Sequence, residues 1–145
     1  MTEIRSARFA ELDPKTAYLL WKLRVDVFVV EQECPYPELD GRDLEPATVH
    51  LWAEDPDAPG EPVACLRILD DGEVARVGRV VTAASHRGRG LAAELIRDAI
   101  ERIGERPSVL DAQAHLEGWY ARFGYAATGP QFLEDGIPHV PMRRG

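Results

Sequence analysis

The sequence is poor in the residues that build disulfide frameworks and metal sites. It contains two cysteines, Cys34 and Cys65, which are too few to hold a fold together by disulfides. Neither cysteine belongs to a CxxC pair and no HExxH segment occurs, so the sequence predicts no bound metal. With 145 residues, the chain is long enough to bury a core that is stable without such aids.

Long apolar runs and a positive net charge are also missing. No apolar stretch approaches the roughly 18 residues that a membrane span needs, and residues 2–5 form no apolar signal region. The formal net charge is −8 and the pI is near 5.0, which argues against general binding to nucleic acid or to anionic membranes. We therefore expect one cytoplasmic globular domain over residues 1–145, a composition of 45% hydrophobic and 29% charged residues being ordinary for that class.

Apolar periodicity predicts an α/β domain with a mixed sheet. Helices are expected over residues 13–30, from Gly90 to Ile103 and over residues 117–123. Strands are expected over residues 3–9, 49–54, 63–69, 76–82, 109–112, 125–128 and 139–143. The short turns after residues 54 and 69 predict an antiparallel meander, whereas the long helix after Gly90 predicts that the next strand is parallel.

Residues 31–48 form a long loop with an unusual composition. The loop contains three prolines and six acidic residues against a single arginine, Arg42. Irregular segments of this length are usually functional loops or disordered ones, and the Pro35-Tyr36-Pro37 segment favours an ordered loop. Its acids either draw a cationic amine towards a site or keep the loop solvated, and the sequence leaves both interpretations open.

One stretch is basic within this acidic chain. From Arg76 to Leu91 there are four arginines and no acidic residue, and Gly88 and Gly90 lie directly before a helix. A helix N-terminus presents N–H groups without intrahelical partners and a partial positive charge, and glycines let an anion approach them closely. The stretch therefore predicts a site for a small polyanionic ligand, although a glycine-containing turn with solvated arginines would show the same residues.

Two kinds of glycine-rich loop compete for this stretch. Residues 88–93 fit the GxGxxA variant of the dinucleotide-binding fingerprint, with Asp111 near the spacing of the ribose-binding acid. However, residues 83–87 separate the expected strand from the first glycine, and only 55 residues follow Gly90. A P-loop is excluded because no GK[ST] segment is present.

The second interpretation rests on a resemblance. Residues 87–92 match R-x-x-G-x-[GA], and with the strand before them and the helix after them they resemble motif A of the GNAT superfamily of N-acetyltransferases. Residues 113–125 resemble the family pattern N-x-x-A-x-x-x-Y-x-x-x-G-[FY], with Tyr120 and Gly124 in place, Gln113 at the usual Asn and Leu116 at the usual Ala. Segments 27–43, 112–116 and 136–139 look like the ElaA-like branch, so the resemblance covers about residues 17–142.

The resemblance implies a GNAT fold, in which helices flank a mixed central β-sheet with a V-shaped opening between the fourth and fifth strands. It implies acetyl-CoA as cosubstrate and direct transfer of the acetyl group to a primary amine of a small molecule or a protein. The residues that it places against CoA are Val80, Val81, Thr82, Arg87, Gly88, Arg89, Gly90, Leu91, Ala92 and Gln113. The backbone of residues 80–82 would pair with pantetheine as a further strand would, and the N–H near Val81 would stabilise the oxyanion.

The same resemblance and ordinary acid–base chemistry indicate the catalytic candidates. By its position in the family pattern, Tyr120 is the expected general acid that protonates the departing thiolate. Glu31, His115 and His139 are candidates for the base that deprotonates the ammonium, and the sequence does not choose among them. An acyl-cysteine intermediate on Cys34 is disfavoured because no sequence pattern places a base beside it.

Two other functions remain open from the sequence. One is an acyl-CoA-binding module without turnover, and the other is a nucleotide-binding domain built on the GxGxxA match. A homodimer formed through the final strands is also open, since nothing in the sequence decides the oligomeric state.

Overall fold

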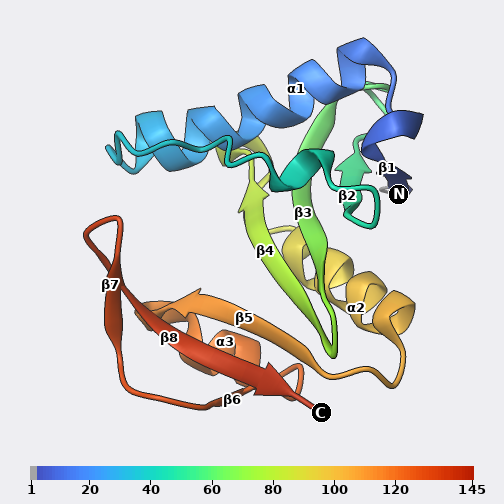
Figure 1. The fold of residues 1–145 in the computed structure, drawn as a ribbon. Coiled ribbons are helices and arrows are strands. Elements are labelled where there is room, and N and C mark those ends of the chain that lie inside the picture. Colours follow the sequence, from blue (N-terminus) through green and yellow to red (C-terminus); the bar gives the residue numbers. More distant parts are fainter. Residues whose placement is uncertain (1–2) are drawn as a thin grey trace.

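Eight strands form one mixed sheet in the computed structural model, which describes residues 3–145 (Figure 1). The strands are β1 (Glu3–Arg8), β2 (Val49–Glu54), β3 (Pro62–Asp71), β4 (Val74–Thr82), β5 (Ser108–Gln113), β6 (Ala126–Ala127), β7 (Phe132–Glu134) and β8 (Ile137–Arg144). Their spatial order is β1-β2-β3-β4-β5-β8-β6, and β7 pairs with β8. The helices are α1 (Pro14–Arg24), α2 (Leu91–Ile103) and α3 (Glu117–Ala121).

The predicted fold class is confirmed. Strands β2, β3 and β4 pair antiparallel as the predicted meander, β1 pairs antiparallel with β2, and β4 pairs parallel with β5 after the α2 crossover. The β4–β5 register joins Ala75 to Ser108 and Arg76 to Val109, after which the two strands diverge (Figure 1). This divergence is the V-shaped opening between the fourth and fifth strands.

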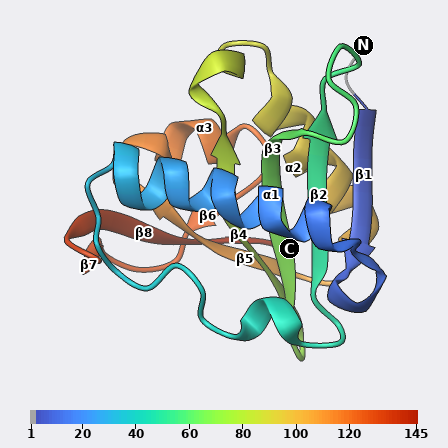
Figure 2. The same ribbon diagram turned by 90° about the horizontal axis from the view of Figure 1, so that it is seen from above.

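Helices cover both faces of the meander. Helix α1 lies across β2, β3 and β4 on one face, and α2 lies on the other (Figures 1 and 2). Because successive strand residues point to opposite faces, Trp52 packs with Leu20 and Leu23 of α1, whereas Leu51 and Ala53 pack with the α2 side. Both faces are buried, which explains why β2 and β3 consist of nearly continuous apolar residues.

The first helix has the expected start and an unexpected second half. Asp13 caps α1 by accepting a hydrogen bond from the Thr16 N–H (2.9 Å), and Pro14 occupies the first helical position. The α-helix ends at Arg24 and continues as a π-helix over Val25–Glu31, so its full extent agrees with the expected 13–30. Such π-helical turns are rare and occur frequently at functional sites.

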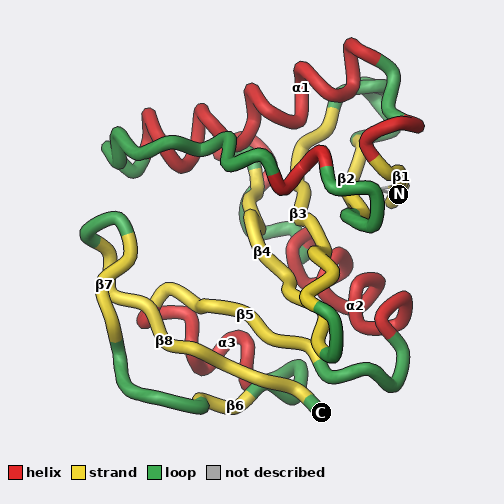
Figure 3. Tube along the Cα trace, viewed as in Figure 1, coloured by secondary structure: helices red, strands yellow, loops and turns green. Residues whose placement is uncertain are grey.

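The C-terminal part differs most from the sequence-based expectation. Helix α3 begins at Glu117 as expected but ends at Ala121 and not at residue 123, because the N–H groups of residues 122–124 bond to carbonyls three positions back, as in a tight turn. Strand β7 was not predicted; it joins β8 through Asp135 and Gly136, both with positive φ, which is the geometry of a two-residue hairpin turn (Figure 3). Over residues 3–145, no helix combines the length and apolar character that spanning a membrane needs.

Candidate active site

A cleft of about 970 Å³ occupies the opening between β4 and β5. Its walls come from the π-helical turn, the loop after it, β4, the start of α2, β5, α3 and the β7–β8 hairpin. Because β4 and β5 have separated there, the edge of β4 that faces β5 is open to the cleft over residues 77–82, while its other edge pairs with β3. The exposed edge of a strand offers backbone donors and acceptors to an extended ligand.

Most of the residues implied to contact CoA are brought together here. Those that line the cleft are Val80, Val81, Thr82, Arg87, Gly88, Gly90, Leu91, Ala92 and Gln113. Arg89 lies outside the lining, with 58% of its side chain exposed and Nη1 4.0 Å from Asp55 Oδ2. The structure therefore places nine of the ten residues around one cavity and leaves Arg89 on its outer rim.

The glycines before α2 have a conformational reason to be glycine. Gly88 (φ 79°) and Gly90 (φ 76°) both adopt the left-handed backbone region, and Gly90 is the N-cap of α2. A Cβ built on either residue would meet no atom within 4 Å, so space is open beside both. The first N–H groups of α2, beginning at Leu91, have no intrahelical partner, and the cleft reaches them. Gly88, Gly90 and the first N–H groups of α2 together form a site that suits a diphosphate, and we call it the diphosphate cradle.

Glu31 and Arg87 form an ion pair at the cleft. Nη1 of Arg87 donates to Oε2 of Glu31 (2.6 Å), and Nη2 donates to Oε1 (2.8 Å). Arg87 Nε also donates to the carbonyl oxygen of Thr82 (3.1 Å). The hydrogen bonds from Arg87 hold the pKa of Glu31 below its usual value, which makes this carboxylate a poorer base than a free one.

Strand β4 contains a bulge that the sequence analysis did not identify. Its register with β3 shifts between Cys65 and Arg67, so that Cys65 faces Val81 and Arg67 faces Gly78. Two residues of β4, Arg79 and Val80, thus stand against one of β3, and Arg79 has a φ of 53°. The isolated glycine at 78, within an otherwise Val-rich strand, was the available signal for this bulge.

Tyr120 is buried at the wall of the cleft. Its ring makes edge-on contacts with Trp119 (centroids 4.8 Å apart) and Tyr125 (6.2 Å), and the residue is 7% exposed. Burial raises the pKa of Tyr120 far above its usual value, so the phenol stays protonated over the whole physiological range. A protonated phenol at this position can donate a hydrogen bond or a proton into the cleft.

The two histidine candidates lie in different surroundings. His139 of β8 faces Gln113 of β5 in the sheet register and lines the cleft. Its Nδ1 lies 2.7 Å from the carbonyl oxygen of Ile137, which can only accept, so Nδ1 is assigned a hydrogen, and Nε2 is the nitrogen that carries the lone pair in the neutral ring. Nε2 lies 3.7 Å from Oε2 of Glu134. His115 is exposed in the 3₁₀ turn and lies outside the cleft lining.

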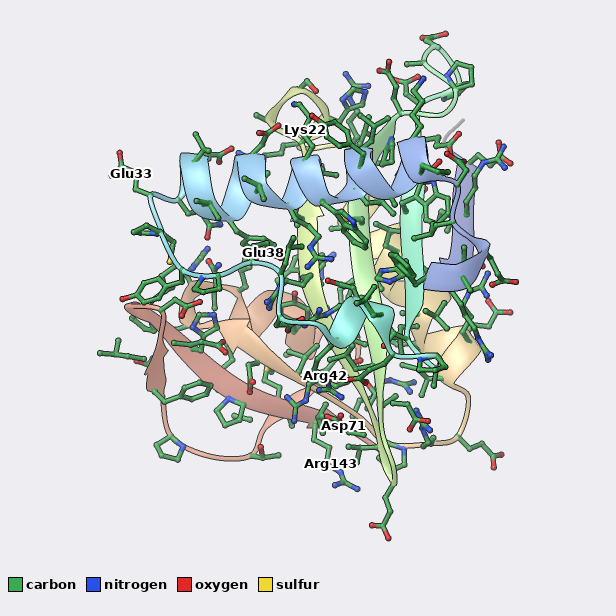
Figure 4. The ribbon with its side chains drawn as sticks, turned by 45° about the horizontal axis from the view of Figure 1, so that its top comes forward. Lys22, Glu33, Glu38, Arg42, Asp71 and Arg143 are labelled. Carbon is green, nitrogen blue, oxygen red and sulfur yellow. The ribbon has the colours of Figure 1, made fainter. Side chains whose placement is uncertain are left out.

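Three of the six acids of the long loop are paired with arginines of the first helix and the sheet. Glu38, Asp40 and Asp43 form ion pairs with arginines of α1, β3 and β4. Arg24 is 2% exposed, and its Nη1 donates to Asp43 Oδ1 (2.8 Å). Figure 4 shows Glu38 below α1 and, farther along the loop, Arg42 near Asp71, where Arg42 Nη2 donates to Asp71 Oδ1 (2.6 Å). The charges therefore tie the loop to the sheet.

Neither cysteine has the environment of a nucleophile. Cys34 lines the cleft, but its pKa is raised by partial desolvation and by the nearby Asp135 carboxylate. Its thiol donates to the carbonyl oxygen of Asp135 (3.2 Å). Cys65 is buried in β3, and burial raises its pKa to about 12. Nucleophilic cysteines need the opposite shift, so the surroundings of neither thiol favour its thiolate.

Comparison with known proteins identifies the family. Residues 26–144 match the model of the acetyltransferase (GNAT) domain. A UPF0039 protein of Mycobacterium tuberculosis is 49% identical, over 99% of this chain and 94% of that protein. Protein ElaA of Escherichia coli is 38% identical over 99% of this chain and 97% of ElaA, and its crystal structure superposes with a TM-score of 0.91 over the full length of both chains.

A crystal structure from Pseudomonas aeruginosa, described as an acyl-CoA N-acyltransferase, is also similar. It is 41% identical to this chain, with a TM-score of 0.92 and complete coverage of both chains. The segment that matches the family model contains most of the residues that form the cleft. The alignments with the relatives extend over nearly the whole chain. The chain therefore belongs to the GNAT family of acetyltransferases and, within it, to the ElaA-like branch.

Proposed function

We propose that the protein transfers an acetyl group from acetyl-CoA directly to a primary amine of a small molecule or a protein. The observation that carries this proposal is the convergence of three features on one cleft: the N-terminus of α2, the free edge of β4, and the pair of Tyr120 and His139. A diphosphate site, a site for an extended chain and two proton-transfer groups are what this reaction requires together.

The residues present fit acetyl-CoA. The open space beside Gly88 and Gly90 would admit the diphosphate, which the N–H groups at the start of α2 would bind. The edge of β4 from Val80 to Thr82 would pair with the pantetheine amides, and Gln113 lies across the cleft on β5. Acetyl-CoA would supply the acetyl group as a thioester, the thiolate being its leaving group.

The bulge in β4 is suited to polarising the thioester. The backbone N–H of Val80, one of the two bulge residues without a single partner on β3, would donate to the carbonyl oxygen, where negative charge develops as the amine attacks. Tyr120, which its buried position keeps protonated, would donate the proton that the departing sulfur accepts. The C–N bond forms and the C–S bond breaks, the second proton lost by the amine nitrogen would restore the Tyr120 phenol, and no acyl-enzyme would form.

The hairpin side of the cleft is suited to the acceptor amine. Within residues 3–145, Glu134 and Asp135 line the cleft without an arginine partner, whereas its other acids pair with arginines. They would attract an ammonium group. His139 Nε2, whose lone pair is available, would take the ammonium proton, and the Glu134 carboxylate would stabilise the imidazolium. We prefer His139 over Glu31, which Arg87 neutralises, and over the exposed His115.

The experiment is release of CoA thiol from acetyl-CoA, measured over a panel of amines for the wild-type protein and for Tyr120→Phe. We expect amine-dependent release that falls about 10²-fold or more in Tyr120→Phe. Tyr125→Phe is the matched control, because this second buried phenol bonds to Ser108 and lies outside the cleft lining. Equal rates in wild type and Tyr120→Phe would remove Tyr120 from the mechanism.

The alternative is a module that binds acyl-CoA without turnover. It shares the diphosphate cradle and the β4 edge, so binding of CoA alone does not separate the two. Binding of CoA without amine-dependent thiol release, over the full panel, would favour the module. A cytoplasmic location of the protein remains a prediction, which cell fractionation would test. A homodimer formed through the final strands remains another, which sedimentation would test.

A further inference from the structure

Glu38 connects the long loop to the bulge of β4. Its Oε2 accepts hydrogen bonds from Nε of Arg79 (2.6 Å) and from Nε of Arg24 (2.8 Å). Its backbone carbonyl accepts from Nη2 of Arg79 (3.1 Å) and, at 3.4 Å, from Nη2 of Arg24. The Glu38 side chain is 9% exposed and that of Arg24 is 2% exposed. One loop residue thus binds two arginines with both its side chain and its backbone.

Arg79 is the residue whose backbone departs from the strand. Its φ of 53° lies in the left-handed region that side-chain-bearing residues rarely adopt, and strands require negative φ. Such a conformation persists only where the surroundings hold it. The Arg79 side chain is 28% exposed, so packing alone does not fix it; its guanidinium donates two hydrogen bonds to Glu38 and one, at 3.5 Å, to Asp40 Oδ2.

We propose that Glu38 is a positioning residue that holds the β4 bulge in the conformation needed to polarise the thioester. The inference rests on the proposed function, since it assigns the bulge N–H groups to the carbonyl oxygen. Glu38 does not touch the reacting atoms; it acts through Arg79, the first residue of the bulge. Without this restraint we expect Arg79 to return to an extended conformation, which would reorient the peptide N–H of Val80 that follows it.

Arg24 gives the restraint its rigidity. It lies at the end of α1, where the α-helix changes to the π-helical turn, and it is also bonded to Asp43 (2.8 and 3.1 Å). Arg24 therefore holds the carboxylate of Glu38 from the side of α1, and the same carboxylate binds Arg79. This carboxylate therefore connects the long loop with both α1 and β4.

The first experiment compares Glu38→Gln with Glu45→Gln. Glu45 is an acid of the same loop that pairs with Arg42, is 43% exposed in its side chain and lies outside the cleft lining. We expect Glu38→Gln to lower kcat about 10²-fold, as misplacement of a catalytic group by about 1 Å does. The KM for acetyl-CoA should change less than about twofold, because the diphosphate cradle is intact. Glu45→Gln should leave both constants unchanged.

A double-mutant cycle with Arg79→Gly separates positioning from stability. Glycine adopts a φ near 53° without steric cost, so it needs no partner to hold the bulge. Glu38→Gln should therefore have little further effect on kcat in the Arg79→Gly background. If Glu38 supports the fold only through Arg24, the substitution lowers kcat by the same factor in both backgrounds, and the proposal is wrong.

The backbone can be followed without any turnover. The Cα chemical shift and the amide–Hα coupling of Arg79 report its φ in the free protein. We expect these signals to move towards extended values in Glu38→Gln and to stay in place in Glu45→Gln. Unchanged Arg79 signals in a folded Glu38→Gln protein would overturn the proposal. Absence of amine-dependent turnover in the wild type would instead overturn the proposed function, and the two failures are thus distinct.

Discussion

The carboxylate of Glu31 meets the guanidinium of Arg87 through two hydrogen bonds, of 2.6 and 2.8 Å, at the mouth of the cleft. Glu31 closes the π-helical turn that follows α1, and Arg87 belongs to the loop that precedes α2. Arg87, one of the residues that the family resemblance places against CoA, therefore has its guanidinium paired with a carboxylate from another wall of the cleft. Glu31 and the diphosphate would compete for the same guanidinium.

This competition predicts the effect of Glu31→Gln. Loss of the carboxylate leaves Arg87 free to bind the diphosphate, so the affinity for CoA should rise, by about tenfold at most given the exposure of both groups. Titration calorimetry at two salt concentrations measures it, and the gain should shrink in high salt. A loss of kcat with unchanged CoA affinity would contradict this account and would make Glu31 the catalytic base.

The diphosphate cradle predicts a difference between two left-handed glycines. Gly90→Leu should weaken CoA binding by about tenfold for each charged hydrogen bond lost. Gly72→Leu is the matched control: Gly72 has a φ of 78° and equally open space, but it lies in the turn between β3 and β4, away from the cleft. The two variants carry the same backbone strain, and only the first blocks the cradle.

Pantetheine provides the ligand control for the same prediction. It lacks the diphosphate, so its affinity should be low for the wild type and nearly unchanged in Gly90→Leu. Calorimetry with CoA and pantetheine on all three proteins decides the point. Equal loss of CoA affinity in the Gly72 and Gly90 variants would show that strain, not the cradle, causes the effect.

The buried ion pairs predict a large cost for Asp43→Asn. Asp43 accepts hydrogen bonds from Arg24 and Arg67, each less than 5% exposed, and the substitution leaves each buried cation with one carboxylate partner instead of two, Glu38 for Arg24 and Asp40 for Arg67. Removing one partner of such a network lowers the free energy of unfolding by about 3–5 kcal/mol. Urea denaturation measures it. Asp26→Asn, which breaks the exposed pair with Lys22, should leave the urea midpoint unchanged, and a similar shift in both variants would refute the argument.

The same network predicts how stability depends on pH. Hydrogen bonds from Arg67 lower the pKa of Asp40 far below its ordinary value of 3.8, and the guanidiniums of Arg24 and Arg67 lower that of Asp43 although burial opposes them. A carboxylate with a depressed pKa stabilises the fold above its unfolded-state pKa, and this contribution is lost as the pH falls through the folded-state pKa.

We therefore expect the free energy of unfolding to be constant from pH 7 to pH 5 as far as these two acids are concerned, and to decline steeply below about pH 4. Asp40→Asn should flatten that decline, because the substituted side chain no longer titrates. Urea denaturation at a series of pH values measures both curves. An identical slope below pH 4 in the variant would show that Asp40 does not contribute.

The fold could be predicted because its signals are local. The apolar stripe from Ala92 to Ile103 marks α2, and the glycines before it mark the left-handed cap that the structure shows at Gly90. The order of the meander followed from short turns, and the parallel β5 followed from the crossover. Hairpin β7–β8 was missed although Asp135-Gly136 is a strong hairpin signal, because the flanking strand has only three residues, Phe132–Glu134.

The sequence identified which residues line the site, but it did not identify which of their side chains form ion pairs with one another. Motif positions identified the cleft-lining residues, but no sequence pattern indicates that Arg87 faces Glu31 or that Arg79 faces Glu38, which lie 56 and 41 positions apart. The loop acids illustrate the reason. Whether Asp40 is solvated or paired depends on where β3 places Arg67, and such long-range contacts are set by the assembled sheet.

The most direct measurement of the central claim is a single-turnover reaction of the protein with acetyl-CoA and an accepted amine, followed by mass spectrometry of both the products and the intact protein. The account predicts one N-acetylated amine for each CoA released, with the mass of the protein unchanged throughout. Acetylated protein on the path to product, or no acetylated amine from any member of the panel, would contradict it.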